Sequence, residues 1–202
     1  MSDQRIGILG GTFDPLHIGH LILAEYARAA LGLELVLFVP AADPPHKRGE
    51  HKVAIEHRLA MLERAIADNK HFQISRVDID RPGPHYSVDM VHIIAELYPK
   101  AELYFVMGGD SLRDLPTWYH PAGFIQLCKL AVMRRPDEMI QPDLHEAVLP
   151  GLAARVVMID APLVGISSTM IVERLRKGQS ARYLMPDSVL AYILECRLYE
   201  TQ

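Results

Sequence analysis

Short runs of apolar residues recur along the chain, and helical patterns separate most of them. The runs are Arg5–Gly10, Glu34–Pro40, Phe72–Asp80, Ala101–Met107, Lys129–Arg134 and Arg155–Asp160. Most of their apolar residues are consecutive and do not alternate with polar ones, which is typical of strands covered on both faces. The pattern therefore predicts an α/β fold with a doubly wound, Rossmann-like, mainly parallel sheet and helices on both of its faces.

The intervening segments place apolar residues at helical spacing. We expect helices over Ile18–Leu31, Ala54–Asn69, Val88–Tyr98 and Ser188–Tyr199, with Gly32 as the residue that ends the first. Proline and glycine gather in Pro40–Gly49, Arg81–Pro84 and Pro136–Gly151, which we interpret as loops and not as interdomain linkers. We therefore expect a single domain over residues 1–202.

Composition and net charge limit the kinds of molecule that the chain is expected to bind. A chain of 202 residues, 50% of them hydrophobic, can bury about 70% of its unfolded surface without disulfides or a structural metal. Its net charge of −4 argues against binding nucleic acid by bulk charge, although a pocket for an anionic small molecule needs only a few local cations. The sequence has no signal peptide and no apolar run long enough to span a membrane, so we expect a cytoplasmic protein.

The two cysteines, Cys128 and Cys196, lie among apolar residues. Neither belongs to a CxxC pair or to a zinc-binding spacing. We interpret both as buried thiols in a reducing compartment.

The segment GGTFDPLHIGH, Gly10–His20, joins the first predicted strand to the first helix. In open α/β sheets that junction is where ligands bind, and paired glycines allow a close approach to the backbone. The segment is neither a P-loop nor a GxGxxG motif. His17 and His20 share one face at the start of the helix, where the dipole and free N–H groups favour an anion. A phosphate is the ligand that fits best; a metal site would need a third ligand that the sequence does not supply, and merely exposed histidines are the other alternative.

A second motif, ISSTMIVERLRKG, covers Ile166–Gly178 and starts a further amphipathic helix. Ser167, Ser168 and Thr169 can cap that helix, and they can equally bind phosphate oxygens beside its first amides. Taken alone, the segment favours capping; together with the first motif it favours phosphate binding.

GTFDPLHIGH resembles the signature of the nucleotidyltransferase superfamily related to class I aminoacyl-tRNA synthetases. The resemblance implies that the turn binds ATP and that His17 and His20 contact its phosphates. The residues so implied are Gly10, Gly11, Thr12, Phe13, His17, Gly19 and His20. The second motif resembles the superfamily's ISSTxIR, which implies that its three hydroxyl residues hold the β- and γ-phosphates. Val172 stands where that family has arginine, so Arg174, Arg176 or Lys177 would have to supply the missing contact.

Three further segments look like those of the bacterial nicotinate-mononucleotide adenylyltransferases, and the resemblance covers nearly the whole chain. They are DPPHK at Asp43–Lys47, RPGPHYS at Arg81–Ser87, and GGDS at Gly108–Ser111 followed by LPTWY at Leu115–Tyr119. His85 replaces a serine of the family pattern and Ser87 a threonine; whether His85 contacts substrate stays open.

This resemblance implies where the two substrates bind. The implied mononucleotide site comprises Asp14, His46, Lys47, Tyr86, Ser87, Trp118 and Tyr119, and the ATP site gains Gly108, Asp110 and Arg134. Trp118 would stack on the pyridine ring, with plain core packing as the alternative. Backbone amides around Ser87 and Tyr119 would receive the carboxylate. Asp110 could instead cap a helix, Lys47 could be solvated, Tyr86 and Tyr119 could pack internally, and Arg134 could be an ordinary surface residue.

The implied reaction joins ATP to nicotinate mononucleotide and yields deamido-NAD and pyrophosphate, a step of NAD biosynthesis. Its nucleophile is a phosphate already ionised at pH 7, so no general base is needed. We expect His17 and His20 to stabilise the transition state, with Mg²⁺ carried by ATP and no dedicated metal site on the protein. Alternatives on the same fold are a phosphopantetheine adenylyltransferase-like enzyme, a cytidylyltransferase or a non-catalytic ATP-binding regulator. The preference for the nicotinate over the nicotinamide mononucleotide rests on resemblance alone.

Overall fold

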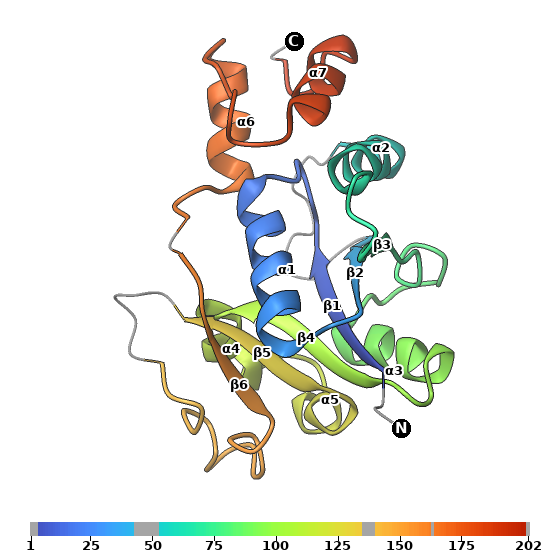
Figure 1. Cartoon of the computed structure of the whole chain (residues 1–202), viewed down its shortest axis with the longest axis vertical. Coiled ribbons are helices and arrows are strands. Elements are labelled where there is room, and N and C mark those ends of the chain that lie inside the picture. The colour runs from blue at the N-terminus through green and yellow to red at the C-terminus, as the bar shows by residue number, and fades with distance from the viewer. Residues whose placement is uncertain (1–3, 43–52, 135–139, 163, 201–202) are drawn as a thin grey trace.

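A six-stranded parallel sheet forms the centre of the molecule in the computed structural model, which describes residues 4–42, 53–134, 140–162 and 164–200 (Figure 1). The strands are β1 (Arg5–Gly11), β2 (Leu35–Pro40), β3 (Phe72–Ile74), β4 (Glu102–Gly108), β5 (Lys129–Arg134) and β6 (Val156–Asp160). They lie in the order β3-β2-β1-β4-β5-β6, and every neighbouring pair is parallel. The order reverses between β1 and β4, and this switch point is where open α/β sheets leave a crevice for ligands.

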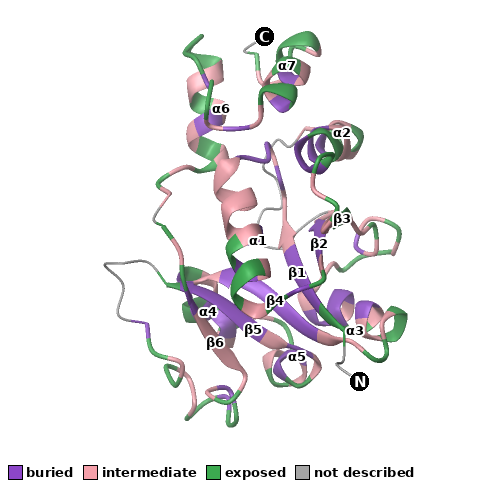
Figure 2. Ribbon diagram, viewed as in Figure 1, coloured by how far each residue is buried: buried purple, intermediate pink, exposed green. Residues whose placement is uncertain are grey.

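Helices cover both faces of the sheet, as the alternating pattern predicts. They are α1 (Ile18–Leu31), α2 (Ile55–Ile66), α3 (Ser87–Leu97), α4 (Gly109–Asp114), α5 (Pro121–Leu127), α6 (Ser168–Arg176) and α7 (Asp187–Glu195), with a 3-10 turn, η2 (Leu115–Thr117). Successive strand residues point to opposite sides: in β4, Tyr104 and Val106 join the cluster under α1 and α2, whereas Phe105 joins the cluster under α3 and α5. The sheet is therefore buried on both faces, and Figure 2 shows its inner strands as the most buried part of the chain.

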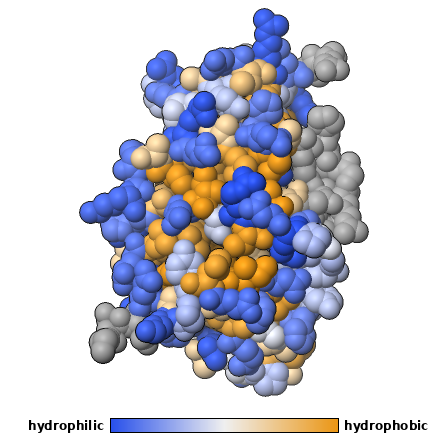
Figure 3. Space-filling view, turned by 90° about the vertical axis from the view of Figure 1, so that its right-hand side faces the viewer, coloured by the Kyte–Doolittle hydropathy of each residue, from blue (hydrophilic) through white to orange (hydrophobic). Residues whose placement is uncertain are grey.

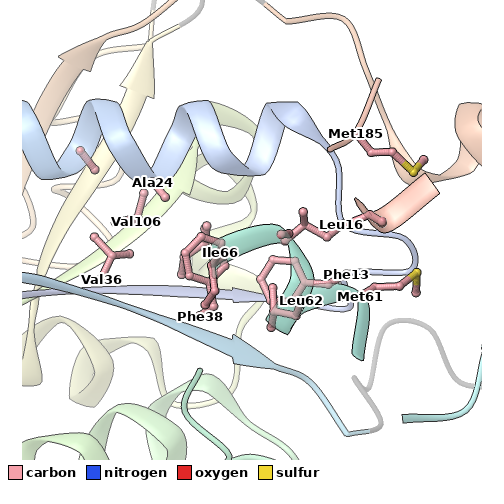
Figure 4. Packing of buried hydrophobic residues seen from close by; sticks show 14 of the residues in the cluster. Phe13, Leu16, Ala24, Val36, Phe38, Met61, Leu62, Ile66, Val106 and Met185 are labelled. Atoms are coloured by element: carbon pink, nitrogen blue, oxygen red, sulfur yellow. The ribbon is translucent and has the colours of Figure 1, made fainter. Parts of the chain in front are cut away.

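The C-terminal helices α6 and α7 extend the first cluster beyond the carboxyl end of β1 (Figure 1). Figure 4 shows Met185, which precedes α7, beside Leu16 of the β1–α1 turn, while Phe13 of the same turn lies against Leu62 of α2. Phe13, Leu16, Leu62 and Met185 are each no more than 2% exposed. The turn that follows β1 is consequently packed between α2 and the C-terminal segment.

The surface of the molecule is not uniformly polar. Figure 3 views the side that lies on the right in Figure 1, and apolar side chains form a contiguous area at its centre within a hydrophilic rim. No helix among the described residues is long and apolar enough to cross a bilayer.

The predicted elements differ from the observed ones mainly after β3. The run Phe72–Asp80 was expected to be one strand, but the strand ends at Ile74 because Asp78 turns inward to accept hydrogen bonds from Arg81 and from the amide of Ala42. Helices α4 and α5 are short and were not predicted. Gly32 adopts the left-handed conformation expected of the residue that ends α1, with φ at 61°.

Only one of the two thiols is buried as predicted. Cys128 lies in the core, where burial raises its pKa to about 12, whereas Cys196 is half-buried. Both are free thiols.

Candidate active site

The carboxyl ends of β1, β2 and β4 enclose a cavity of about 620 Å³, which we call the main cavity. Its lining includes Gly10, Gly11, Thr12, His20, Ala41, Asp78, His85, Tyr86, Ser87, Gly108, Trp118 and Tyr119. A side cavity of about 220 Å³ lies towards β5 and is lined by His17, Gly19, His20, Gly108, Arg134, Ile166 and others. Since His20 and Gly108 line both, the two cavities meet at the switch point of the sheet.

A larger and more open depression, of about 810 Å³, lies at the other end of the sheet between Arg5, Glu34 and Lys100. It contains none of the motif residues. Ligand sites of open α/β sheets lie at the carboxyl ends of the strands, so we assign the site to the main and side cavities.

Two glycines of the first motif leave room for neighbouring rings. A Cβ atom at Gly11 would lie 3.0 Å from the ring of Phe13, and one at Gly19 would lie 2.9 Å from the ring of His17. Phe13 is buried, has a positive φ of 50° and contacts the His20 ring edge-on at 5.1 Å between centroids. Phe13 therefore supports His20 from behind and does not line either cavity.

His17 and His20 face each other, with ring centroids 3.8 Å apart. Nδ1 of His20 accepts a hydrogen bond from the backbone N–H of His17 at 3.2 Å, so the proton of a neutral His20 ring is assigned to Nε2, which can donate to a ligand. His17 is 7% exposed, and burial lowers its pKa to about 4. His17 is therefore neutral at pH 7 before an anion binds.

Nδ1 of His17 is buried and has no hydrogen-bond partner among the described residues. A buried polar atom without a partner is costly, and such an atom at the edge of a cavity is explained when a ligand supplies the partner. The arrangement of the two imidazoles at the start of α1 thus fits an anionic ligand with acceptor oxygens.

The hydroxyl residues of the second motif lie at the start of α6, against the same turn. Ser167 is the N-cap of α6 and accepts from the amide of Met170 at 3.2 Å, as the capping interpretation predicts. Ser168 donates to the carbonyl of Pro15 at 2.9 Å, and Thr169 is exposed. None of the three lines the two cavities.

Aromatic side chains form one wall of the main cavity. Tyr86 and Tyr119 stack on each other, with centroids 4.1 Å apart and planes 19° apart. Trp118 packs against Phe105 and Phe124 of the core, with ring centroids 5.9 and 5.3 Å away, and also lines the cavity, so core packing does not remove it from the cavity wall. Ser87 is the first residue of α3 and Tyr86 its N-cap, which places the positive end of this helix at the cavity.

Sequence reasoning missed a buried ion pair beside that wall. Asp78 is 3% exposed, lies 2.6 Å from Arg81 and lines the main cavity. Arg81 also donates to the carbonyls of Pro84 and Tyr86 and so positions the approach to α3. Nδ1 of His85 lies 3.6 Å from the same carboxylate. The available signal is Asp78 itself, an acidic residue inside a run whose apolar pattern predicts a strand.

The other expected site residues are distributed as follows. Gly108 lines both cavities; Arg134 lines the side cavity and lies 3.6 Å from Asp160. Asp110 is the second residue of α4 and not its cap, and it is paired with Arg113 at 3.3 Å. Asp14 lies outside the lining and accepts from the amide of Val53 and the hydroxyl of Tyr199. His46 and Lys47 lie outside the described residues.

Comparisons with known proteins show the family of the chain. The model of the cytidylyltransferase-like family matches residues 8–174. A probable nicotinate-nucleotide adenylyltransferase of Thermomicrobium roseum is 46% identical over 198 residues, covering 98% of this chain and 92% of that protein. The corresponding protein of Roseiflexus sp. RS-1 is 43% identical over 202 residues, covering 98% of this chain and all of that protein.

Among solved structures, the Plasmodium falciparum nicotinic acid mononucleotide adenylyltransferase complexed with NaAD superposes with a TM-score of 0.78 over 97% of each chain. Its sequence identity is 17%, so it supports the fold alone. The level of identity to the bacterial relatives over nearly the full chain is what decides the family. The chain therefore belongs to the cytidylyltransferase-like nucleotidyltransferases and, within them, to the nicotinate-nucleotide adenylyltransferases.

Proposed function

We propose that the chain joins ATP to nicotinate mononucleotide at the point where the main and side cavities meet, giving deamido-NAD and pyrophosphate. The observation that carries this proposal is the position of His20, which lines both cavities and directs a donor, Nε2–H, away from the backbone N–H of His17. A transfer between two phosphate-bearing substrates needs donors at such a junction.

The side cavity would hold the nucleoside part of ATP, with Arg134 and Gly108 in its lining. The triphosphate would then lie along the glycine turn, Gly10 to Thr12, and the start of α1. Ser167, Ser168 and Thr169 at the start of α6 would reach its outer phosphates, since the hydrogen bond from Ser168 to Pro15 places α6 beside this turn. Phe13 would act by supporting His20.

The main cavity would hold the mononucleotide. Trp118 offers an aromatic surface for the pyridine ring, and Tyr86, Ser87 and Tyr119 surround it. The positive end of α3 would favour a carboxylate over an amide in this position. His46 and Lys47 stay candidates for the phosphate of this substrate, and Asp14 would act by holding the backbone at Val53.

In the proposed step, an oxygen of the mononucleotide phosphate attacks the α-phosphorus of ATP. A new bond forms between them while the bond from the α-phosphorus to the bridging oxygen breaks, and pyrophosphate leaves with the electron pair. The nucleophile is already ionised, so no protein group has to remove a proton. His20 would donate to the oxygens on which charge grows, and the phosphates would raise the pKa of the neutral His17.

Magnesium would enter with the nucleotide. The described residues contain no group of three or more histidine, cysteine, aspartate or glutamate side chains that could hold a metal. A magnesium ion held chiefly by phosphate oxygens would neutralise part of their charge. We infer that the chain acts as one nucleotidyltransferase domain.

A pyrophosphate-release assay with ATP–Mg²⁺ and a set of acceptors tests the function. Release with nicotinate mononucleotide but not with phosphopantetheine is the expected result. Release only with phosphopantetheine would assign the chain to that enzyme class, and no release with any acceptor would favour a nucleotide-binding regulator. Comparing kcat/KM for the nicotinate and nicotinamide mononucleotides then tests the preference for the acid.

A further inference from the structure

Three hydrogen bonds connect the C-terminal part of the chain to the β1–α1 turn and the start of α1. The Ser168 hydroxyl donates to the carbonyl of Pro15, and the N–H of Ile18 donates to the carbonyl of Leu184, each at 2.9 Å. The Tyr199 hydroxyl donates to the Asp14 carboxylate, across 185 positions in sequence. These contacts lie on both sides of His17 in the chain.

The contact between Tyr199 and Asp14 is well suited to fix the turn. Burial raises the pKa of Tyr199, and the neighbouring Asp14 raises it further, so the hydroxyl keeps its proton and donates. The second carboxylate oxygen of Asp14 accepts from the amide of Val53 at 3.1 Å, just before α2. Asp14 therefore joins the turn to two segments that are far apart in sequence.

Arg58 of α2 contacts the same turn near its start, at Thr12. Its side chain is buried, with the residue only 2% exposed, and it donates to the carbonyls of Thr12 at 2.9 Å and Ala41 at 2.8 Å. Thr12 and Ala41 both line the main cavity. Burial lowers the pKa of Arg58, and the charge of Asp14 opposes that shift, so the buried cation has an anion close by.

We propose that Arg58, Asp14 and Tyr199 form a positioning network for adenylyl transfer. Their hydrogen bonds fix the backbone of the turn that carries His17 and His20. None of the three lines either cavity, so their effect is on geometry and not on substrate contact. Displacing a catalytic group by about 1 Å can lower turnover about 100-fold. The proposal rests on the catalytic roles proposed for the two histidines.

The network also gives the C-terminal segment a part in the reaction. The match to the family model ends at residue 174, before α7 and Tyr199. The segment completes the support of the turn through packing as well, since Met185 lies beside Leu16 (Figure 4). We therefore expect catalysis to depend on a residue at the far end of the chain.

The test compares Tyr199→Phe with the control Tyr192→Phe. Each change removes one hydroxyl: that of Tyr199 bonds to the turn, whereas that of Tyr192 bonds to Nδ1 of His57 at 2.8 Å between α7 and α2. We expect Tyr199→Phe to lower kcat for pyrophosphate release about tenfold while KM for ATP and for the acceptor changes less than about twofold. Tyr192→Phe should leave kcat unchanged, whatever it does to Tm.

Both variants are assayed at a temperature at which circular dichroism shows them fully folded. Unchanged kcat in Tyr199→Phe, or an equal fall in both variants, would overturn the proposal. If Tyr199→Phe does not fold, Arg58→Lys replaces it: lysine keeps the charge but lacks the fork that reaches two carbonyls, and a lower kcat with unchanged KM is again expected.

The outcome is separable from that of the proposed function. Wild-type activity with the set of acceptors tests the reaction, and the ratio of variant to wild type tests the network with whichever acceptor supports turnover. A wild type that binds ATP without turnover would refute the function, and it would also refute a network that exists to position catalytic groups.

Discussion

The two cavities that meet at His20 are lined by different kinds of residue. The side cavity combines two imidazoles, two glycines and Arg134 with apolar side chains such as Met133 and Ile166. The main cavity has an aromatic wall, with Trp118, Tyr86 and Tyr119 supported by the core and by the buried pair of Asp78 and Arg81. Under the proposed function, the contrast teaches that the nucleoside part of ATP and the pyridine ring of the acceptor would be bound by separate parts of the fold. Changes in the two parts should therefore affect different kinetic constants.

His20→Ala should have the largest effect. Loss of a donor that stabilises growing charge costs about 100-fold to 1,000-fold in kcat, or about 3–4 kcal/mol. Steady-state kinetics of pyrophosphate release measure this directly, with KM for the acceptor as the internal control. Turnover near the wild-type value would remove His20 from the reaction and erase the contrast between the two cavities.

His17 should make the free energy of unfolding depend on pH. Its pKa is about 4 in the folded protein and about 6.5 in an unfolded chain, so the unfolded state binds the proton first as the pH falls. The free energy of unfolding should drop by about 2 kcal/mol between pH 7 and pH 5 because of this one group. Denaturant titrations of wild type and His17→Gln would measure it.

The difference between these two proteins is the informative quantity. It should be independent of pH above about pH 7.5, where His17 is neutral in both states, and should shift in favour of His17→Gln as the pH falls. Parallel curves down to pH 5 would show that His17 is not kept neutral by burial.

Trp118→Ala should act on the acceptor and not on ATP. Stacking of a flat ring on an aromatic side chain contributes about 1–2 kcal/mol, so we expect KM for nicotinate mononucleotide to rise about tenfold. KM for ATP should stay within about twofold. Because Trp118 also packs against Phe124, Trp118→Phe is the matched variant that keeps an aromatic ring and should restore most of the affinity.

Arg134→Ala should have the smallest effect. Arg134 is exposed and lies 3.6 Å from Asp160 at the surface, where ion pairs and single contacts contribute little. We expect KM for ATP to rise about threefold with kcat unchanged. A rise in the acceptor KM instead would mean that the side cavity does not receive the nucleoside part of ATP.

The pattern of the sequence predicted the parallel sheet and most of its elements. Consecutive apolar residues identified every strand, and β5 matches its predicted bounds. The strand after residue 72 was expected to be three times its observed length, because the inward turn of Asp78 depends on Arg81 and Ala42, not on local periodicity. The short helices α4 and α5 carry too few residues for a helical period to be visible.

For the candidate site, the sequence singled out residues that lie close together in the chain. Gly11, His17, Gly19 and His20 fall within ten positions, and their spacing predicted an anion site at the start of a helix. Tyr86 and Trp118 were expected near the acceptor, yet that Tyr86 stacks on Tyr119 and that Trp118 also packs on core rings emerged only from the folded chain.

Only the tertiary structure decided which distant residues contact the β1–α1 turn. Arg58 is indistinguishable in sequence from a surface arginine on an amphipathic helix, and Tyr199 from any aromatic near a chain end. In the fold, Arg58 is buried against the carbonyls of Thr12 and Ala41, and Tyr199 reaches Asp14. The physical reason is sequence separation. Helical and strand periodicity depends on neighbours within a few positions, whereas the partners of a buried charge can lie far away in the chain and come together only in the folded protein.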